Sequence, residues 1–137
     1  MSFLKNIAIK SVTKKRTRQF TALIETALNT DEFQHGDINS RVLRILNKLI
    51  ETIENQDPSG RSTLNIDTNK IDNWKKLLFC LVIQATRSEL AYDPSISEDT
   101  DFLLMEKVFN CEIEFWKKRI KNNLAEHEKL LFGQKSS

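Results

Sequence analysis

The stretch Leu77-Leu78-Phe79-Cys80-Leu81-Val82-Ile83 places seven apolar residues in succession, without a charged or polar side chain between them. A helix that is apolar all round over two turns is expected to be surrounded by other elements. The run is much shorter than the roughly 20 residues that a membrane-spanning helix needs. We therefore expect it to lie in the central helix of a soluble bundle, over about 70–91, and we expect no membrane span.

On both sides of this stretch, apolar residues recur every three or four positions, which is the period of a helix, and no segment alternates as a strand does. Three glycines and two prolines in 137 residues leave little material for a loop-rich fold. The sequence predicts an all-α protein with one domain, residues 1–137, built as a compact bundle of four to five helices. The expected helices cover about 3–29, 38–55, 70–91, 98–121 and 124–132, with a flexible loop near 56–68 and a loose tail at 133–137.

The end of the fourth helix allows two interpretations. Lys117, Lys118 and Arg119 come shortly before Asn122-Asn123, and cations are favoured near the carboxyl end of a helix by its dipole. This distribution favours a break near Asn122 and a short final helix. The alternative is one uninterrupted helix of about 35 residues, roughly 50 Å long.

Basic residues are concentrated before the first acidic residue, Glu25. Lys10, Lys14 and Arg18 are spaced four residues apart, so one helix would carry them as a ridge, and the second helix carries another ridge. Such ridges predict salt-dependent contact with nucleic-acid phosphates, although the same side chains also suit two ordinary solvated helices. The candidate nucleic-acid-binding residues are Lys10, Lys14, Lys15, Arg16, Arg18, Arg41, Arg44 and Lys48.

Acidic residues are concentrated between Glu89 and Glu114, where eight carboxylates stand against the single cation Lys107. This segment is expected to pair with the basic ridges of the same molecule or of a neighbouring copy. In the second case, copies of the chain would assemble head to tail into an open array. The candidate protein-contact residues are Glu98, Asp99, Asp101 and Glu106.

Motifs of catalysis are missing from the sequence. It has no glycine-rich phosphate loop, no nucleophile elbow and no HExxH motif, and Glu32 to His35 gives one Glu-x-x-His spacing without the second copy that a di-iron bundle needs. Cys80 and Cys111 are too few for a disulfide framework and suit reduced core positions in the cytoplasm. We expect no enzymatic activity, no metal or other cofactor and no small-molecule substrate.

Both tryptophans stand in similar hexapeptides, Ile71 to Lys76 and Ile113 to Lys118. Trp74 and Trp116 each follow an isoleucine by three positions, which predicts a shared apolar face and a place in the core. The alternative is that each ring stacks on a base while the adjacent lysines hold phosphates.

A small, wholly helical chain with basic ridges and no catalytic residues resembles the small subunit of CRISPR effector complexes, whose copies line up along the guide and displaced strands. The resemblance is architectural, covers about Phe3 to Phe132 and involves no sequence motif. It implies a role in antiviral defence and contact of Lys14, Arg18 and Arg41 with a nucleic-acid backbone, without chemistry by this chain.

The sequence thus predicts a non-catalytic subunit that binds RNA or single-stranded DNA without sequence specificity, inside a larger complex such as one of the CRISPR type. The alternative is a protein-interaction module, such as an adaptor, a chaperone-like subunit or an immunity protein, that uses the acidic region or an apolar patch. A third interpretation takes residues 1–24 as a membrane-surface helix or a cleavable targeting segment, because they contain cations, hydroxyls and hydrophobes but no acid.

Overall fold

The computed structural model describes residues 2–56, 70–90 and 99–132, and every regular element among them is helical. This confirms the all-α prediction. The expected loop near 56–68, apart from Gln56, and the tail at 133–137 lie outside the described residues. The elements are α1 (Ser2–Leu28), the short 3-10 helix η1 (Asp31–Phe33), α2 (Ile38–Asn55), α3 (Trp74–Glu89) and α4 (Asp99–Phe132).

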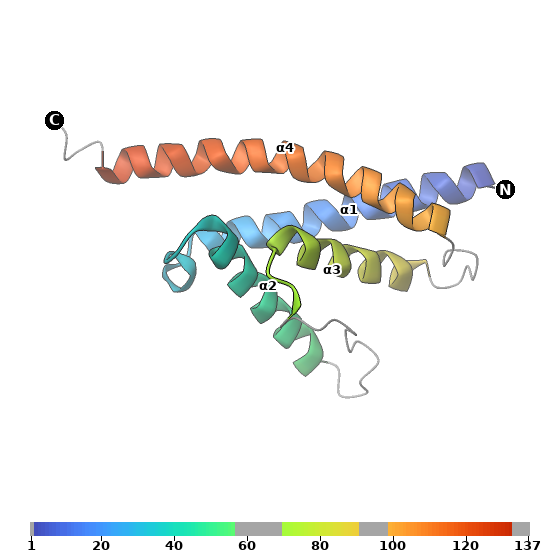
Figure 1. Cartoon of the computed structure of the whole chain (residues 1–137), viewed down its shortest axis with the longest axis horizontal. Helices are drawn as coiled ribbons and strands as arrows, with labels where there is room; N and C mark the ends of the chain where they lie inside the picture. The colour runs from blue at the N-terminus through green and yellow to red at the C-terminus, as the bar shows by residue number, and fades with distance from the viewer. Residues whose placement is uncertain (1, 57–69, 91–98, 133–137) are drawn as a thin grey trace.

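The two longest helices, α1 and α4, run side by side in the same direction, and α3 runs the opposite way along α1 (Figure 1). Two cross-helix ion pairs fix the parallel register, because Lys5 meets Asp101 near the start of both helices and Glu25 meets Arg119 further along. The helix α2 leans away from this layer, and α4 continues beyond the end of α1. No helix among the described residues has the length and apolar character to cross a membrane.

Local capping signals set the start of α2 where the sequence places it. Gly36 adopts a left-handed backbone with φ of 97°, which favours glycine. The carboxylate of Asp37 then accepts a hydrogen bond from the backbone N–H of Ser40 at 2.8 Å, as an N-cap residue does. These signals are contiguous in the chain, and the predicted bounds 38–55 are confirmed.

The start of α3 differs from the prediction. The helix begins at Trp74 rather than near residue 70, because Asn73 has an extended backbone and its side chain accepts the N–H of Lys75 at 2.9 Å. Asn39 of α2 reinforces this start by accepting the N–H of Trp74 at 3.2 Å and donating to the carbonyl of Asp72 at 3.1 Å. A residue from another helix therefore helps to set the boundary, which a local pattern does not reveal.

The predicted break near Asn122 is wrong. Residues 99–132 form one helix of 34 residues, which is about 51 Å long. Asparagine in a helix interior costs only about 0.7 kcal/mol or less relative to alanine, and this segment contains no proline or glycine to stop the helix. The expected fifth helix, 124–132, is the last part of α4.

The core is formed by all four long helices, and α1 rather than α3 makes the most extensive contacts. In the stretch from Leu77 to Ile83, four side chains are buried, but Phe79, Cys80 and Ile83 are only half-buried, so α3 is not fully surrounded. The main cluster of buried residues includes Phe20, Ile24, Leu46, Leu77, Leu81, Phe109 and Ile113. A second, smaller cluster of Ile9, Leu90 and Met105 joins the start of α1 to α3 and α4.

Buried threonines explain why the role of α1 escapes the sequence pattern. Thr13, Thr17 and Thr21 are all buried on the face of α1 that packs into the bundle. The hydroxyl of Thr17 donates to the carbonyl of Thr13 at 2.8 Å, and that of Thr21 donates to the carbonyl of Arg18 at 3.1 Å. Such local bonds satisfy the hydroxyl within its own helix and allow it to be buried. A hydrophobic pattern counts these positions as polar.

Both tryptophans belong to the core, which confirms the first interpretation of their hexapeptides. Trp74 and Trp116 are buried and pack edge to face, with ring centroids 5.5 Å apart and planes at 72°. The indole N–H of Trp116 donates to the carboxylate of Glu25 at 2.7 Å. Neither ring is exposed for stacking on a base.

Candidate interaction surface at the start of α1 and α4

The basic face of α1 is paired with acidic side chains of the same molecule. Arg18 reaches both carboxylate oxygens of Glu112 on α4, at 3.0 and 3.4 Å, and Lys14 lies 3.8 Å from the same carboxylate. Glu112 is half-buried between the helices. These cations therefore join α1 to α4 instead of facing an open surface alone.

Glu89, at the end of α3, holds two further candidate nucleic-acid-binding residues of α1 that lie outside the predicted ridge. Lys15 lies 2.7 Å and Arg16 2.9 Å from its carboxylate. The hydrogen bond from Lys15, with the positive charges of both side chains, keeps the pKa of Glu89 below its ordinary value. Lys5 is 3.0 Å from Asp101, whose side chain is buried. Of the two pairings that the charge pattern allows, the structure shows the one within the molecule.

Arg41 has a structural role at the junction of α1, η1 and α2. Its Nε donates to the carbonyl of Phe33 at 2.7 Å and its Nη2 donates to the carbonyl of Leu28 at 3.2 Å. Leu28 is the last residue of α1, where carbonyls lack partners inside the helix. The guanidinium therefore stabilises the end of one helix and the turn that follows it.

The other two cations of the predicted ridge on α2 contact the same connection. Arg44 donates to the backbone carbonyl of His35. Lys48 bonds the carboxylate of Glu32 and lies 5.8 Å from the centre of the Phe33 ring. With Asp37, whose pKa is lowered chiefly by the hydrogen bond from Ser40, these contacts fix the segment between α1 and α2.

Among the eight candidate nucleic-acid residues, only Lys10 has no hydrogen bond or ion pair to another described residue. Among the candidate protein-contact residues, Asp101 is buried against Lys5 and Glu106 is half-buried. Asp99 is the first residue of α4, and Glu98 lies outside the described residues. Cations of α1 thus meet the acidic region, whereas the ridge of α2 contacts the segment between α1 and α2. The contact of either charged region with a partner stays a prediction.

A different surface emerges where α1 and α4 begin. Large apolar side chains are exposed there on both helices, and the pair formed by Lys5 and Asp101 holds these first turns together. The members of this surface, which we call the apolar end, are Phe3, Leu4, Ile7, Phe102 and Leu103. Such a concentration of exposed apolar groups is typical of an interaction site.

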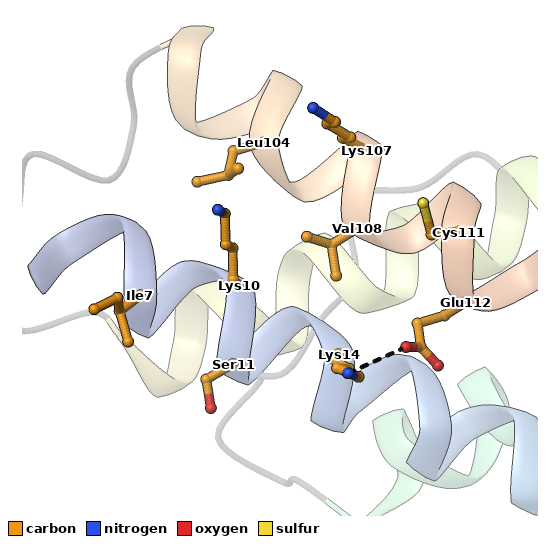
Figure 2. Close-up of a pocket in the computed structure, with 9 residues that line it drawn as sticks. All are labelled: Ile7, Lys10, Ser11, Lys14, Leu104, Lys107, Val108, Cys111 and Glu112. Carbon is orange, nitrogen blue, oxygen red and sulfur yellow. Dashed lines mark ion pairs between the residues drawn. The ribbon is translucent and has the colours of Figure 1, made fainter. Parts of the chain in front are cut away.

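An open groove of about 520 Å³ lies between α1 and α4 next to the apolar end. From α1 it is lined by Ile7, Lys10, Ser11 and Lys14. From α4 it is lined by Leu104, Lys107, Val108, Cys111 and Glu112. In Figure 2, Lys10 extends from α1 toward α4, Leu104 and Val108 extend toward α1, and the ion pair of Lys14 with Glu112 lies at one end.

No known protein family matches this chain, and no curated protein or solved structure is significantly similar to it. The assignment of the surface therefore depends on geometry alone. The described part of the chain contains no group of three or more histidine, cysteine or acidic side chains arranged to hold a metal. Cys80 is half-buried, and burial raises the pKa of its thiol, whereas Cys111 is exposed at the edge of the groove.

The groove could have been found from one signal in the sequence. Phe3, Ile7, Lys10 and Lys14 recur at steps of four, three and four, which places them on one face of a helix. Because this face mixes apolar residues with lysines, it differs from a core face and from a purely charged one. A face of that kind suits contact with an amphipathic partner.

Proposed function

We propose that this protein is a non-catalytic interaction module that binds another protein through its apolar end. The observation that carries the proposal is the exposure of large side chains there, which is 72% for Phe3, 68% for Leu4 and 63% for Leu103. Water contact with so much apolar surface is unfavourable by about 25 cal/mol per Å², and a protein contact removes it. The parallel helices α1 and α4 present these side chains at one end of the molecule.

The arrangement of charges supports a protein partner over a nucleic-acid backbone. A phosphate that bound Lys14, Lys15, Arg16 or Arg18 would have to compete with Glu89 or Glu112. Contact with phosphates depends on cations and gains little from exposed leucine or phenylalanine side chains. The centres of protein interfaces are instead depleted in charge and enriched in apolar groups. The apolar end has this composition of a protein interface.

Site-specific photocrosslinking in cells tests this proposal. A photoreactive phenylalanine analogue at Phe3 or Ile7 is expected to give one discrete protein adduct, because these positions lie in the contact. The matched control is Leu23, which lies on the same helix and is 47% exposed, as Ile7 is, but does not line the groove. The adducts are identified by mass spectrometry after nuclease treatment.

The expected adduct forms at Phe3 and Ile7, survives nuclease and is lost when Leu4→Glu is added to the same chain. Equal adducts at Leu23 would mean that the helix crosslinks without selectivity, and the proposal would fail. It would also fail if neither position at the apolar end gave an adduct. Adducts that disappear with nuclease would favour nucleic acid as the partner.

A second candidate function is that of a nucleic-acid-binding subunit in a larger complex, such as one of the CRISPR type. One observation favours it: Lys10, Lys107 and Lys118 are exposed and make no ion pair with any other residue that the structure describes. These cations are available to phosphates without competition from a carboxylate. The first two lie on opposite sides of the groove.

The salt dependence of binding measures how many cations take part. For single strands the slope of log K against log salt is about −0.7 for each phosphate neutralised, so three free lysines give about −2 and all eight predicted cations about −6. We expect a slope near −2 for a random RNA or DNA of about 30 nucleotides, measured by fluorescence anisotropy from about 50 to 200 mM salt.

The triple variant Lys10→Ala, Lys107→Ala and Lys118→Ala is expected to lose this binding, whereas Lys75→Ala serves as control, because the ammonium of Lys75 is 3.6 Å from the carboxylate of Glu114. A slope near −6 would show that the paired cations leave their carboxylate and carbonyl partners for phosphate. Absence of binding at about 50 mM salt would exclude this second function for the free protein.

A further inference from the structure

We infer that the groove between α1 and α4 binds an amphipathic helix of the partner protein. This helix carries acidic side chains on both sides of its apolar face. The inference rests on the proposed function and names the kind of partner. The apolar lining of the groove comes from Ile7 on α1 and from Leu104 and Val108 on α4. A third helix can lay its ridge of side chains into a furrow between two parallel helices.

Lysines flank this apolar lining on both sides. Lys10 of α1 and Lys107 of α4 are exposed, line the groove and have no acidic partner among the described residues. Lys14 lies at the end of the groove, where Glu112 already pairs with it and with Arg18, so Lys10 and Lys107 supply the unpaired positive charge. The surrounding charge is therefore positive, and an occupant with carboxylates beside its apolar face is complementary to it.

The dimensions also suit a short helix. The lining of the groove runs from Ile7 to Lys14 on α1 and from Leu104 to Glu112 on α4, which is about two turns or roughly 12 Å, so it matches about eight residues of a partner helix. The acidic segment of a second copy is a poor occupant, because Glu89, Asp101 and Glu112 are held by cations of their own chain. We therefore assign the groove to a different protein.

The probe is a fluorescent designed peptide of about 18 residues, with leucines along one helical face and glutamates on both sides of them. Two matched peptides replace the glutamates by lysines or scramble the sequence at the same composition. With the full chain, the acidic peptide is expected to bind with a dissociation constant in the range of roughly 1–100 μM, at least about tenfold tighter than either control.

Two sets of variants locate the binding. Ile7→Glu is expected to weaken the acidic peptide at least about tenfold, whereas Leu23→Glu, at an equally exposed position of the same helix, leaves the affinity unchanged. Lys10→Glu combined with Lys107→Glu is expected to reverse the preference, so that the lysine peptide binds better. Circular dichroism establishes that each variant keeps its helical content.

Alkylation of Cys111 gives a second readout at the groove itself. Its thiol is exposed there, while Cys80 is half-buried with a raised pKa, so iodoacetamide is expected to modify Cys111 first. The bound acidic peptide should slow this reaction several-fold in the parent chain and leave it unchanged in Ile7→Glu. Protection that persists in Ile7→Glu would place the peptide elsewhere and overturn the assignment.

The inference is overturned if the acidic peptide fails to bind at about 1 mM, or if the scrambled peptide binds equally well. Its failure is distinguishable from failure of the proposed function. Crosslinks at Ile7 without peptide binding would keep the interaction module and remove the acidic helix as its partner. Displacement of the groove-bound peptide by a random RNA would show that the cations of the groove also serve nucleic acid, and this too would overturn a protein-only assignment.

Discussion

Replacing Phe109 with alanine is expected to lower the free energy of unfolding by about 3–5 kcal/mol, the range for removing a buried aromatic ring. Phe109 lies in α4 with 1% of its surface exposed, and its ring centroid is 4.9 Å from that of Phe79 on α3. It belongs to the main core cluster, in which all four long helices meet. Removal of the ring leaves a cavity that these helices can close only in part.

Urea denaturation and thermal unfolding measure this loss, and a fall in melting temperature of roughly 10–17 °C is expected for a domain of this size. Phe115→Ala is the matched control, because the same substitution in the same helix removes a ring that is 72% exposed. The control should change stability by no more than about 0.5 kcal/mol. Equal effects at the two positions would contradict the packing of α4 that the structure shows.

The sequence was most informative where structural signals are local. The bounds of α2 follow from Gly36 and Asp37, which lie next to the first turn that they set up. Periodic apolar residues likewise placed Phe109, Ile113 and Trp116 in the core. The start of α3 was misplaced because a distant residue contributes to it, since Asn39 of α2 contacts the cap.

The role of α1 shows a different limit of pattern reasoning. Its buried face combines Ile9, Phe20 and Ile24 with the threonines at positions 13, 17 and 21. A search for apolar periodicity treats a threonine as polar, because an unbonded hydroxyl is costly in free energy to bury. The hydrogen bonds from Thr17 and Thr21 to carbonyls of their own helix remove most of this cost. Apolar periodicity alone therefore does not identify α1 as the helix with the most extensive contacts.

The sequence shows where the charged residues lie, but it does not show which of them form ion pairs. The sequence shows a basic start and an acidic stretch from Glu89 to Glu114, and it leaves open whether these pair within one molecule. Arg18 and Glu112 are 94 positions apart, so only the parallel packing of α1 and α4 brings them together. The same packing creates the groove, which no single segment contains.

Arg41 provides the second large effect, because it was predicted to bind nucleic acid and instead donates to two carbonyl oxygens. Arg41→Ala leaves the carbonyls of Leu28 and Phe33 without this donor. Each lost partner of a buried or half-buried carbonyl costs roughly 1–3 kcal/mol, so for the two carbonyls we expect a total loss of about 2–6 kcal/mol in the free energy of unfolding. Chemical denaturation measures this difference.

The variant Arg41→Lys distinguishes the contribution of the guanidinium geometry to stability from that of the positive charge. An ammonium group cannot span the two acceptors as the rigid guanidinium does, so lysine should recover less than about half of the lost stability. Arg44→Ala is the control, since Arg44 is exposed and donates to the single carbonyl of His35. RNA binding is measured on the same variants. Removal of a residue that stabilises a helix end must lower the stability. If Arg41→Ala kept its stability but bound RNA more weakly, the structural role would be contradicted and the nucleic-acid-binding role supported.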